Sequence, residues 1–265
     1  IERFIMEEWI GRRISNAHIV QVVEKTRAPQ CLYYLMEHVE GKTLAQWMTE
    51  NPSPEIGVVV GMVQQIVDGL RSLHRRETLH QDLKPDNIMI QPDGVVKIID
   101  LGSAFIAGIH ETSVPLERGQ NLGTMKYSAP EYKLGRRPNT RSDQFALAMI
   151  AYELFTGGKG SPYGEKFADA QTLRDFSALN YQPAARYNPL VPTWVDGALK
   201  KALSINSELR YEVLSELIAD LKQPNAQFLE SGNLPLIQRG PLRFWKGLSA
   251  VLGVVVVVLL WLLVS

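Results

Sequence analysis

The sequence predicts an α+β domain followed by one membrane-spanning helix, and three features support this interpretation. Short apolar runs at 19–23, 32–36, 88–90 and 95–99 have the length and composition of strands. Most of the remaining chain carries apolar residues at helical spacing. Near the end, 244–264 is an almost uninterrupted apolar stretch. Few short strands combined with many helices indicate a mixed fold with a mainly helical part.

The composition excludes several classes of protein. Hydrophobic residues make up 45% of the 265 residues and charged residues 21%, as in an ordinary folded domain. Lys+Arg and Asp+Glu both total 28, so no net charge favours binding to nucleic acid, and we expect no such partner. Cys31 is the only cysteine, which excludes an internal disulfide and suits a reducing compartment. The chain begins with Ile1 and already has helical spacing there, so we interpret it as part of a longer protein.

Helical patterns recur along the chain. The pattern at 57–75 ends in basic residues, as the C-terminus of a helix favours. The pattern at 143–155 is apolar on most sides and predicts a buried helix that ends at two glycines. Further helices are predicted at 2–15, from 44 to 49, at 195–203 and at 213–221.

The apolar stretch at 244–264 predicts a transmembrane helix. At about 1.5 Å per residue it reaches roughly 30 Å, the thickness of a bilayer core. Its only charge is Lys246, and a buried core helix, the alternative, rarely runs so long without a polar face. Arg239 and Arg243 precede it, which places the folded domain on the cytoplasmic side. We expect a single-pass anchor in the inner (cytoplasmic) membrane, reached through a juxtamembrane linker at 223–243.

The strongest motif is HQDLKPDN at 80–87. It resembles the catalytic loop of eukaryotic-type serine/threonine protein kinases, with Gln81 where many members have Arg. The resemblance implies that Asp82 accepts the proton of the substrate hydroxyl and that Lys84 offsets charge on the transferring phosphoryl group. It also implies that Asn87 binds magnesium. A single Asp in a loop is usually just solvated, so the assignment depends on the whole motif.

A second motif, IIDLG at 98–102, follows a strand. It resembles the Asp-Phe-Gly metal motif of the same family with Leu for Phe, which implies that Asp100 bridges magnesium to the ATP phosphates. Alone, Asp-Leu-Gly also fits an ordinary turn after a strand. Its separation from Asp82, with a strand–turn–strand between them, is that of the family, so the two motifs support each other.

A third motif, GTMKYSAPE at 123–131, resembles the end of the kinase activation segment. The resemblance implies that Thr124 bridges the catalytic Asp and Lys, and that Glu131 pairs with a buried Arg. Arg210 is the candidate for that structural pair. Asp143 matches the family residue that braces the catalytic-loop backbone. It also fits an acidic residue favoured at a helix N-terminus, and both interpretations stay open.

Some nucleotide-side features resemble the family as well. Glu7 matches the C-helix glutamate that pairs with the ATP-binding lysine, although Glu8 is an alternative and a solvated glutamate another. The sequence LMEHV at 35–39 resembles the hinge that meets adenine. There Met36 would be the gatekeeper, while the backbone of Glu37 and Val39 would contact the base and Met89 would form its apolar floor.

The resemblance covers most of the chain and implies a two-lobed protein-kinase-like fold at 1–222. The small lobe is truncated, without the Gly-rich loop and strand lysine, and the mainly helical large lobe is complete. The implied reaction is transfer of the ATP γ-phosphoryl group, with Mg²⁺, to Ser or Thr of a protein substrate. The resemblance implies no oligomeric state. We expect weak activity, if any, from this stretch alone.

Two rivals and one narrower relative remain. A pseudokinase or scaffold is favoured by Gln81 but opposed by the intact Asp82, Lys84, Asn87 and Asp100. A small-molecule phosphotransferase of related fold would lack the Lys84 pattern and the third motif. The layout with a terminal span resembles bacterial bifunctional proteins in which a phosphatase domain precedes the kinase.

Overall fold

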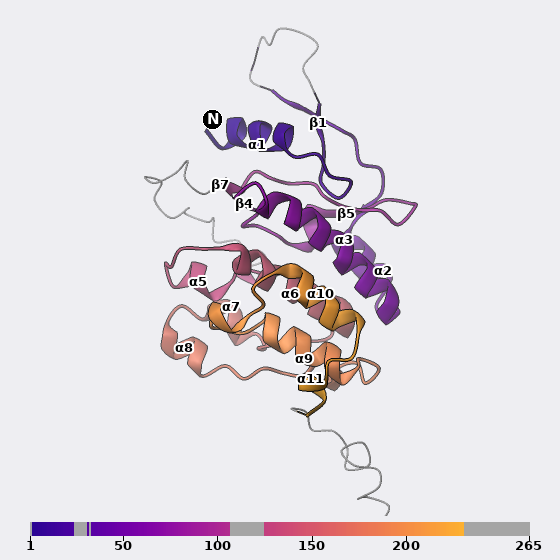
Figure 1. Ribbon diagram of the computed structural model, residues 1–265, viewed down its shortest axis with the longest axis vertical. Helices are drawn as coiled ribbons and strands as arrows, with labels where there is room; N and C mark the ends of the chain where they lie inside the picture. The colour runs from indigo at the N-terminus through magenta and orange to yellow at the C-terminus, as the bar shows by residue number, and fades with distance from the viewer. Residues whose placement is uncertain (1, 24–30, 32, 107–124, 231–265) are drawn as a thin grey trace, which may run out of the picture.

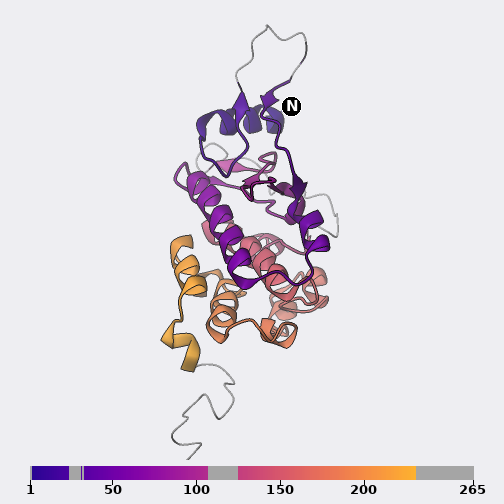
Figure 2. The same cartoon turned by 90° about the vertical axis from the view of Figure 1, so that its right-hand side faces the viewer.

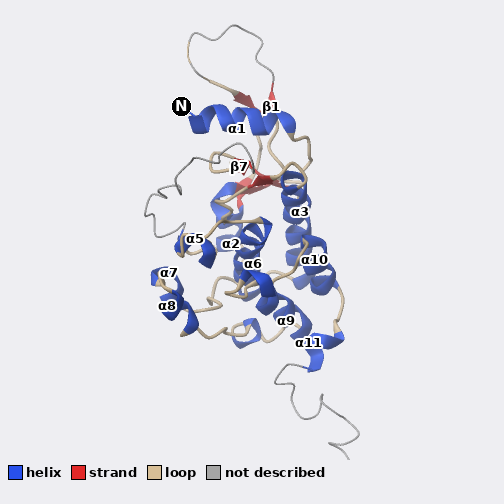
Figure 3. Ribbon diagram, turned by 60° about the vertical axis from the view of Figure 1, so that its left-hand side comes forward, coloured by secondary structure: helices blue, strands red, loops and turns tan. Residues whose placement is uncertain are grey.

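The computed structural model describes residues 2–23, 31, 33–106 and 125–230. Thr124 and the predicted transmembrane helix at 244–264 therefore lie outside the described residues. Figure 1 shows α1 (Glu2–Arg13) and short strands at one end and a larger helical part at the other. In Figure 3 the strands gather near α1, while the opposite end consists of helices and loops. This is the division into a small and a large lobe that the sequence predicts.

The strands that the structure describes form three small antiparallel sheets. β1 pairs with β2, β3 with β5 and β5 with β6, while β4 pairs with β7. An isolated parallel bridge from Ile19 to Ile98 joins the N-terminal segment to β6. The strands are β1 (Val22–Val23), β2 (Leu35–Met36), β3 (Lys42–Thr43), β4 (Thr78–Leu79), β5 (Ile88–Ile90), β6 (Val96–Ile98) and β7 (Phe105–Ile106).

The long helices form the core of the large lobe. α3 packs against α6 and α10, and α9 contacts α6, α10 and α11; Figure 2 shows α3 and α10 side by side. The helices after α1 are α2 (Leu44–Glu50), α3 (Ile56–His74), α5 (Pro130–Lys133), α6 (Thr140–Thr156), α7 (Lys166–Asp169), α8 (Leu173–Ser177), α9 (Thr193–Ala202), α10 (Leu214–Lys222) and α11 (Ala226–Glu230).

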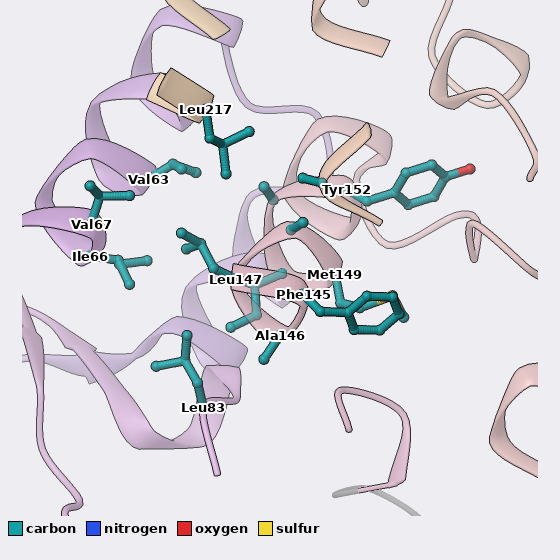
Figure 4. Packing of buried hydrophobic residues seen from close by; sticks show 14 of the residues in the cluster. Val63, Ile66, Val67, Leu83, Phe145, Ala146, Leu147, Met149, Tyr152 and Leu217 are labelled. Carbon is teal, nitrogen blue, oxygen red and sulfur yellow. The ribbon is translucent and has the colours of Figure 1, made fainter. Parts of the chain in front are cut away.

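The helix α6 is buried from Ser142 to Thr156, as its sequence predicts. It begins earlier than the apolar pattern because Asn139 caps it, with a capping box to Ser142. Figure 4 shows Leu147 of α6 among side chains of α3, with Leu83 of the 80–87 loop in the same cluster. The loop that carries the strongest motif is thus packed into the main apolar cluster.

The predictions of helices were mostly right, and the differences are local. The strand predicted at 19–23 is regular only at Val22–Val23, and the short strand β3 at Lys42–Thr43 was not predicted. The predicted linker at 223–243 contains α11, which packs on α9. A Cβ on Gly197 would lie only 2.5 Å from the Cβ of Phe228, so these two helices are in close contact. The apolar contact of Phe228 explains this difference.

Within the part of the chain that the structure describes, one helix is long and apolar enough to span a membrane. This is α3, with a mean hydropathy of 1.2, and half of its most apolar stretch is buried inside the fold. Nine of its residues between Val59 and Leu73 are buried.

Candidate active site

The 80–87 loop runs between β4 and β5 and brings its three predicted functional side chains together. Lys84 Nζ lies 3.0 Å from Asp82 Oδ2. Asn87 Nδ2 donates to the backbone oxygen of Asp82 at 2.9 Å and lies 3.3 Å from its Oδ2. The short 3₁₀ turn Pro85–Asn87 places the amide of Asn87 back over Asp82. Carboxylate, ammonium and amide therefore form one hydrogen-bonded cluster.

Asp143 of α6 accepts hydrogen bonds from the first residues of this loop. Its Oδ2 accepts from the backbone N–H of His80 at 2.9 Å, and its Oδ1 accepts from that of Gln81 at 3.0 Å. His74 Nε2 lies 2.8 Å from Oδ2. Gln81 has a φ of 67°, in the left-handed region that non-glycine residues rarely adopt, so the two N–H bonds stabilise an otherwise costly turn. Asp143 makes the contacts predicted for the brace and also lies in the first turn of α6, so the two interpretations are compatible.

The electrostatics of the brace follow from its burial. Burial by itself would raise the pKa of Asp143, but hydrogen bonds and charge from His74, with His80 adding to them, lower it overall. Burial also lowers the pKa of His80, so its imidazole is neutral near pH 7. His80 Nδ1 lies 3.3 Å from the backbone nitrogen of Asp82, a contact that the sequence did not reveal. A neutral imidazole can accept there.

Asp100 follows β6, beside the end of the catalytic loop. Ile99 N–H donates to the backbone oxygen of Asn87 at 3.0 Å, so the residues before Asp100 run next to Asn87. Asp100 Oδ1 accepts from Gly102 N–H at 2.8 Å, which orients the carboxylate. The described residues hold no cluster of three or more His, Cys, Asp or Glu side chains suited to a metal. Mg²⁺ usually has few protein ligands, because waters and phosphate oxygens complete its coordination. The Asp100 carboxylate and the Asn87 amide would therefore suit it.

Glu7 of α1, in the small lobe, lies close to Gly102 and thus near Asp100. A Cβ on Gly102 would lie 3.3 Å from Glu7 Oε2 and 3.1 Å from Asp100 Oδ1, so both carboxylates flank this glycine. The Tyr34 hydroxyl hydrogen-bonds to Glu7, and burial together with that carboxylate raises the pKa of Tyr34. No pattern in the sequence indicated a role for Tyr34. Two neighbouring carboxylates make this spot favourable for a cation.

The hinge residues lie on and after β2. Met36 is 43% exposed, whereas Val39 is buried and Met89, on β5, is half-buried. Glu37 N–H donates to Gln21 O at 2.9 Å, which ties the hinge to the N-terminal segment. Met36 and Met89 thus lie on strands of two different sheets, Glu37 and Val39 follow β2, and Met36 is the least enclosed of the four.

The predicted structural pair is confirmed. Arg210 and Glu131 form two hydrogen bonds of 2.8 and 2.9 Å, and Ser142 Oγ donates to the same carboxylate at 2.6 Å. Burial would raise the pKa of Glu131, but the hydrogen bonds and charge of Arg210 lower it overall. Both side chains are almost completely enclosed. The pair joins α5, which begins at the end of the third motif, to the residues before α10.

Comparison with known proteins agrees with this geometry. The family described as "Protein kinase domain" matches residues 2–219. Similar proteins are the serine/threonine-protein kinase Pkn1 of Myxococcus xanthus, 30% identical over 91% of this chain, and the serine/threonine-protein kinase PrkC of Bacillus subtilis, 30% identical over 84% of it. The chain covers 35% and 33% of those two proteins, about a third of their length. The fold, the joined motifs and the family match lead to one conclusion: this chain belongs to the protein kinase family, in its bacterial branch of eukaryotic type.

Proposed function

We propose that this chain carries the phosphoryl-transfer part of a protein serine/threonine kinase that uses ATP and Mg²⁺. One observation carries the proposal: Asp82, Lys84 and Asn87 form a hydrogen-bonded cluster in the loop next to the strand that leads to Asp100. The relatives named above are called serine/threonine-protein kinases. A scaffold without chemistry would not need all four side chains, so the pseudokinase alternative is not favoured.

The arrangement suits transfer to a hydroxyl. Asp82 would accept the hydroxyl proton and orient its oxygen, while the Lys84 ammonium would offset charge on the moving phosphoryl group. Asn87 and Asp100 would hold the metal, and magnesium, when bound, neutralises phosphate charge. Catalysis of this kind consists mainly of positioning and charge stabilisation. The brace from Asp143 keeps Asp82 in place without reorganisation during the reaction.

The test is Asp82→Asn in the full-length protein. We expect kcat for phosphorylation of a protein substrate to fall by about 10²–10⁴, because the base is lost, while the unfolding temperature stays within about 2 °C. Asp93→Asn is the matched control, since Asp93 is an exposed carboxylate in the turn between β5 and β6. Turnover that survives Asp82→Asn unchanged contradicts the proposal.

We further propose that 244–264 anchors the domain in the inner membrane with the kinase domain in the cytoplasm. The support is the apolar length of this stretch and the basic residues before it. Deleting 244–264 should move the full-length protein from the membrane fraction to the soluble fraction. If the shortened protein still pellets with membranes, this stretch is not the anchor.

A further inference from the structure

Lys97 is an unusual residue for its place. It stands in the middle of β6, between the buried Val96 and Ile98. Its side chain is only 12% exposed, although lysine is seldom buried without a partner. Its Nζ lies 2.6 Å from Oε1 of Glu37 in the predicted hinge. None of the sequence motifs includes Lys97.

The carboxylate that Lys97 contacts is shared. Glu37 Oε1 also accepts from Gln21 N–H at 2.9 Å, while Glu37 N–H donates to Gln21 O at 2.9 Å. One residue earlier, Val20 N–H donates to Ile98 O at 2.9 Å. The segment around Gln21 therefore lies between β6 and the hinge, and the ion pair spans all three.

Strand β6, which carries Lys97, also runs into the IIDLG motif at 98–102. Lys97 stands opposite Met89 in the register of β5 and β6, and Asp100 follows the end of β6. We propose that Lys97 is a positioning residue for the nucleotide, because its bond to Glu37 fixes the hinge at 35–39 relative to Asp100. The adenine end and the phosphate end of the site are then set by one strand. This inference rests on the proposed function and deepens it.

Among the described residues, the hinge is otherwise held by the short pairing of β2 with β1 and by the backbone bond from Glu37 to Gln21. β2 consists of Leu35 and Met36 only, and these side chains are 40% and 43% exposed. Exposed ion pairs contribute little, but hydrogen bonds between charged groups shielded from water are stronger. Without the Lys97 ammonium, the carboxylate of Glu37 would turn to water and loosen its bond to the N–H of Gln21. The hinge would then shift relative to the strand that ends near Asp100.

The experiment compares Lys97→Met with Lys97→Arg in the full-length protein. Binding of a fluorescent ADP analogue is measured directly, and KM for ATP and kcat are measured separately. We expect Lys97→Met to weaken ADP binding and raise KM about tenfold with kcat within about twofold, the pattern of lost ground-state binding. Lys97→Arg should restore most of the affinity, because it keeps the cation. Lys42→Met removes the lysine of an exposed pair with Glu50 and should leave binding unchanged.

Unchanged ADP affinity in a folded Lys97→Met protein overturns the inference. If Lys97→Met does not fold, Glu37→Gln is measured in its place, because it removes the charge of the other partner. Normal ADP affinity of the Glu37→Gln variant also overturns the inference. The two proposals fail separately. Loss of turnover in Asp82→Asn together with normal affinity in Lys97→Met leaves the kinase assignment intact and removes only the role of Lys97. Activity that survives Asp82→Asn removes the kinase assignment itself.

Discussion

The catalytic loop and the hinge contribute to one site but are held in different ways. The loop is fixed by Asp143, a carboxylate 1% exposed on the core helix α6, and by Leu83 in the main apolar cluster. The hinge is fixed by two-residue strands and the largely buried pair of Lys97 and Glu37. The transfer residues should therefore remain in place as long as the helical lobe is folded. The nucleotide side depends on a few local contacts that can be lost separately.

The largest effect expected from this difference is on the buried pair of the helical lobe. Arg210→Met leaves the Glu131 carboxylate buried without its partner, and the free energy of unfolding should fall by about 3–5 kcal/mol. Chemical denaturation measures this loss. Glu208→Gln is the matched control, because it breaks the ion pair between Glu208 and Arg141. The Glu208 side chain is 71% exposed, so the free energy of unfolding should fall by at most about 1 kcal/mol. Equal losses in the two variants would show that burial does not distinguish them.

Acid should weaken the helical lobe through the brace. The folded pKa of Asp143 is lowered from its ordinary value of 3.8, so its stabilisation is complete above about pH 4 and is lost as the pH falls through the folded pKa. The free energy of unfolding of the unmodified protein should then drop more steeply below about pH 4 than that of Asp143→Asn. If the free energy of unfolding falls equally with pH in the two proteins, protonation of Asp143 does not contribute to acid unfolding.

A smaller effect is expected at the small-lobe carboxylate. Tyr34→Phe removes the hydroxyl that hydrogen-bonds to Glu7 while keeping the ring. A hydrogen bond to a carboxylate at this partly exposed site contributes about 1–1.5 kcal/mol, so kcat/KM for ATP should change by no more than about tenfold. The unfolding free energy should barely change, in contrast to the loss in the helical lobe. A stability loss as large as that of Arg210→Met would break the comparison.

The smallest effect concerns the segment between Asp100 and the third motif. Gln81 stands where many kinases have an Arg that receives an activation-loop phosphate, so a phosphate on Thr112 or Ser113 has less charge to bind there. These two acceptors lie outside the described residues. Thr112→Ala combined with Ser113→Ala should keep the activity of the full-length protein within about twofold. Loss of most activity would show that phosphorylation there is required despite Gln81.

Local pattern was enough for many elements and for the motifs. Apolar spacing predicted α3 and the burial of α6, because periodicity reports directly which faces a helix must bury. Pairing of Glu131 with Arg210 followed from resemblance and is confirmed. The short strands were harder, since two residues of β3 or β1 carry too little pattern to be separated from a turn. α11 was missed because it forms only where Phe228 meets Gly197.

The sequence by itself determined the family, the catalytic motif at 80–87 and the order of the main helices, since these depend on residues close together in the chain. Only the tertiary structure decided that Lys97 meets Glu37, that Tyr34 meets Glu7 and that His80 contacts the backbone of Asp82. A lysine in a strand or a tyrosine before one has no partner that spacing can identify. The partner is selected by which strands pair, and that depends on the packing of the whole domain.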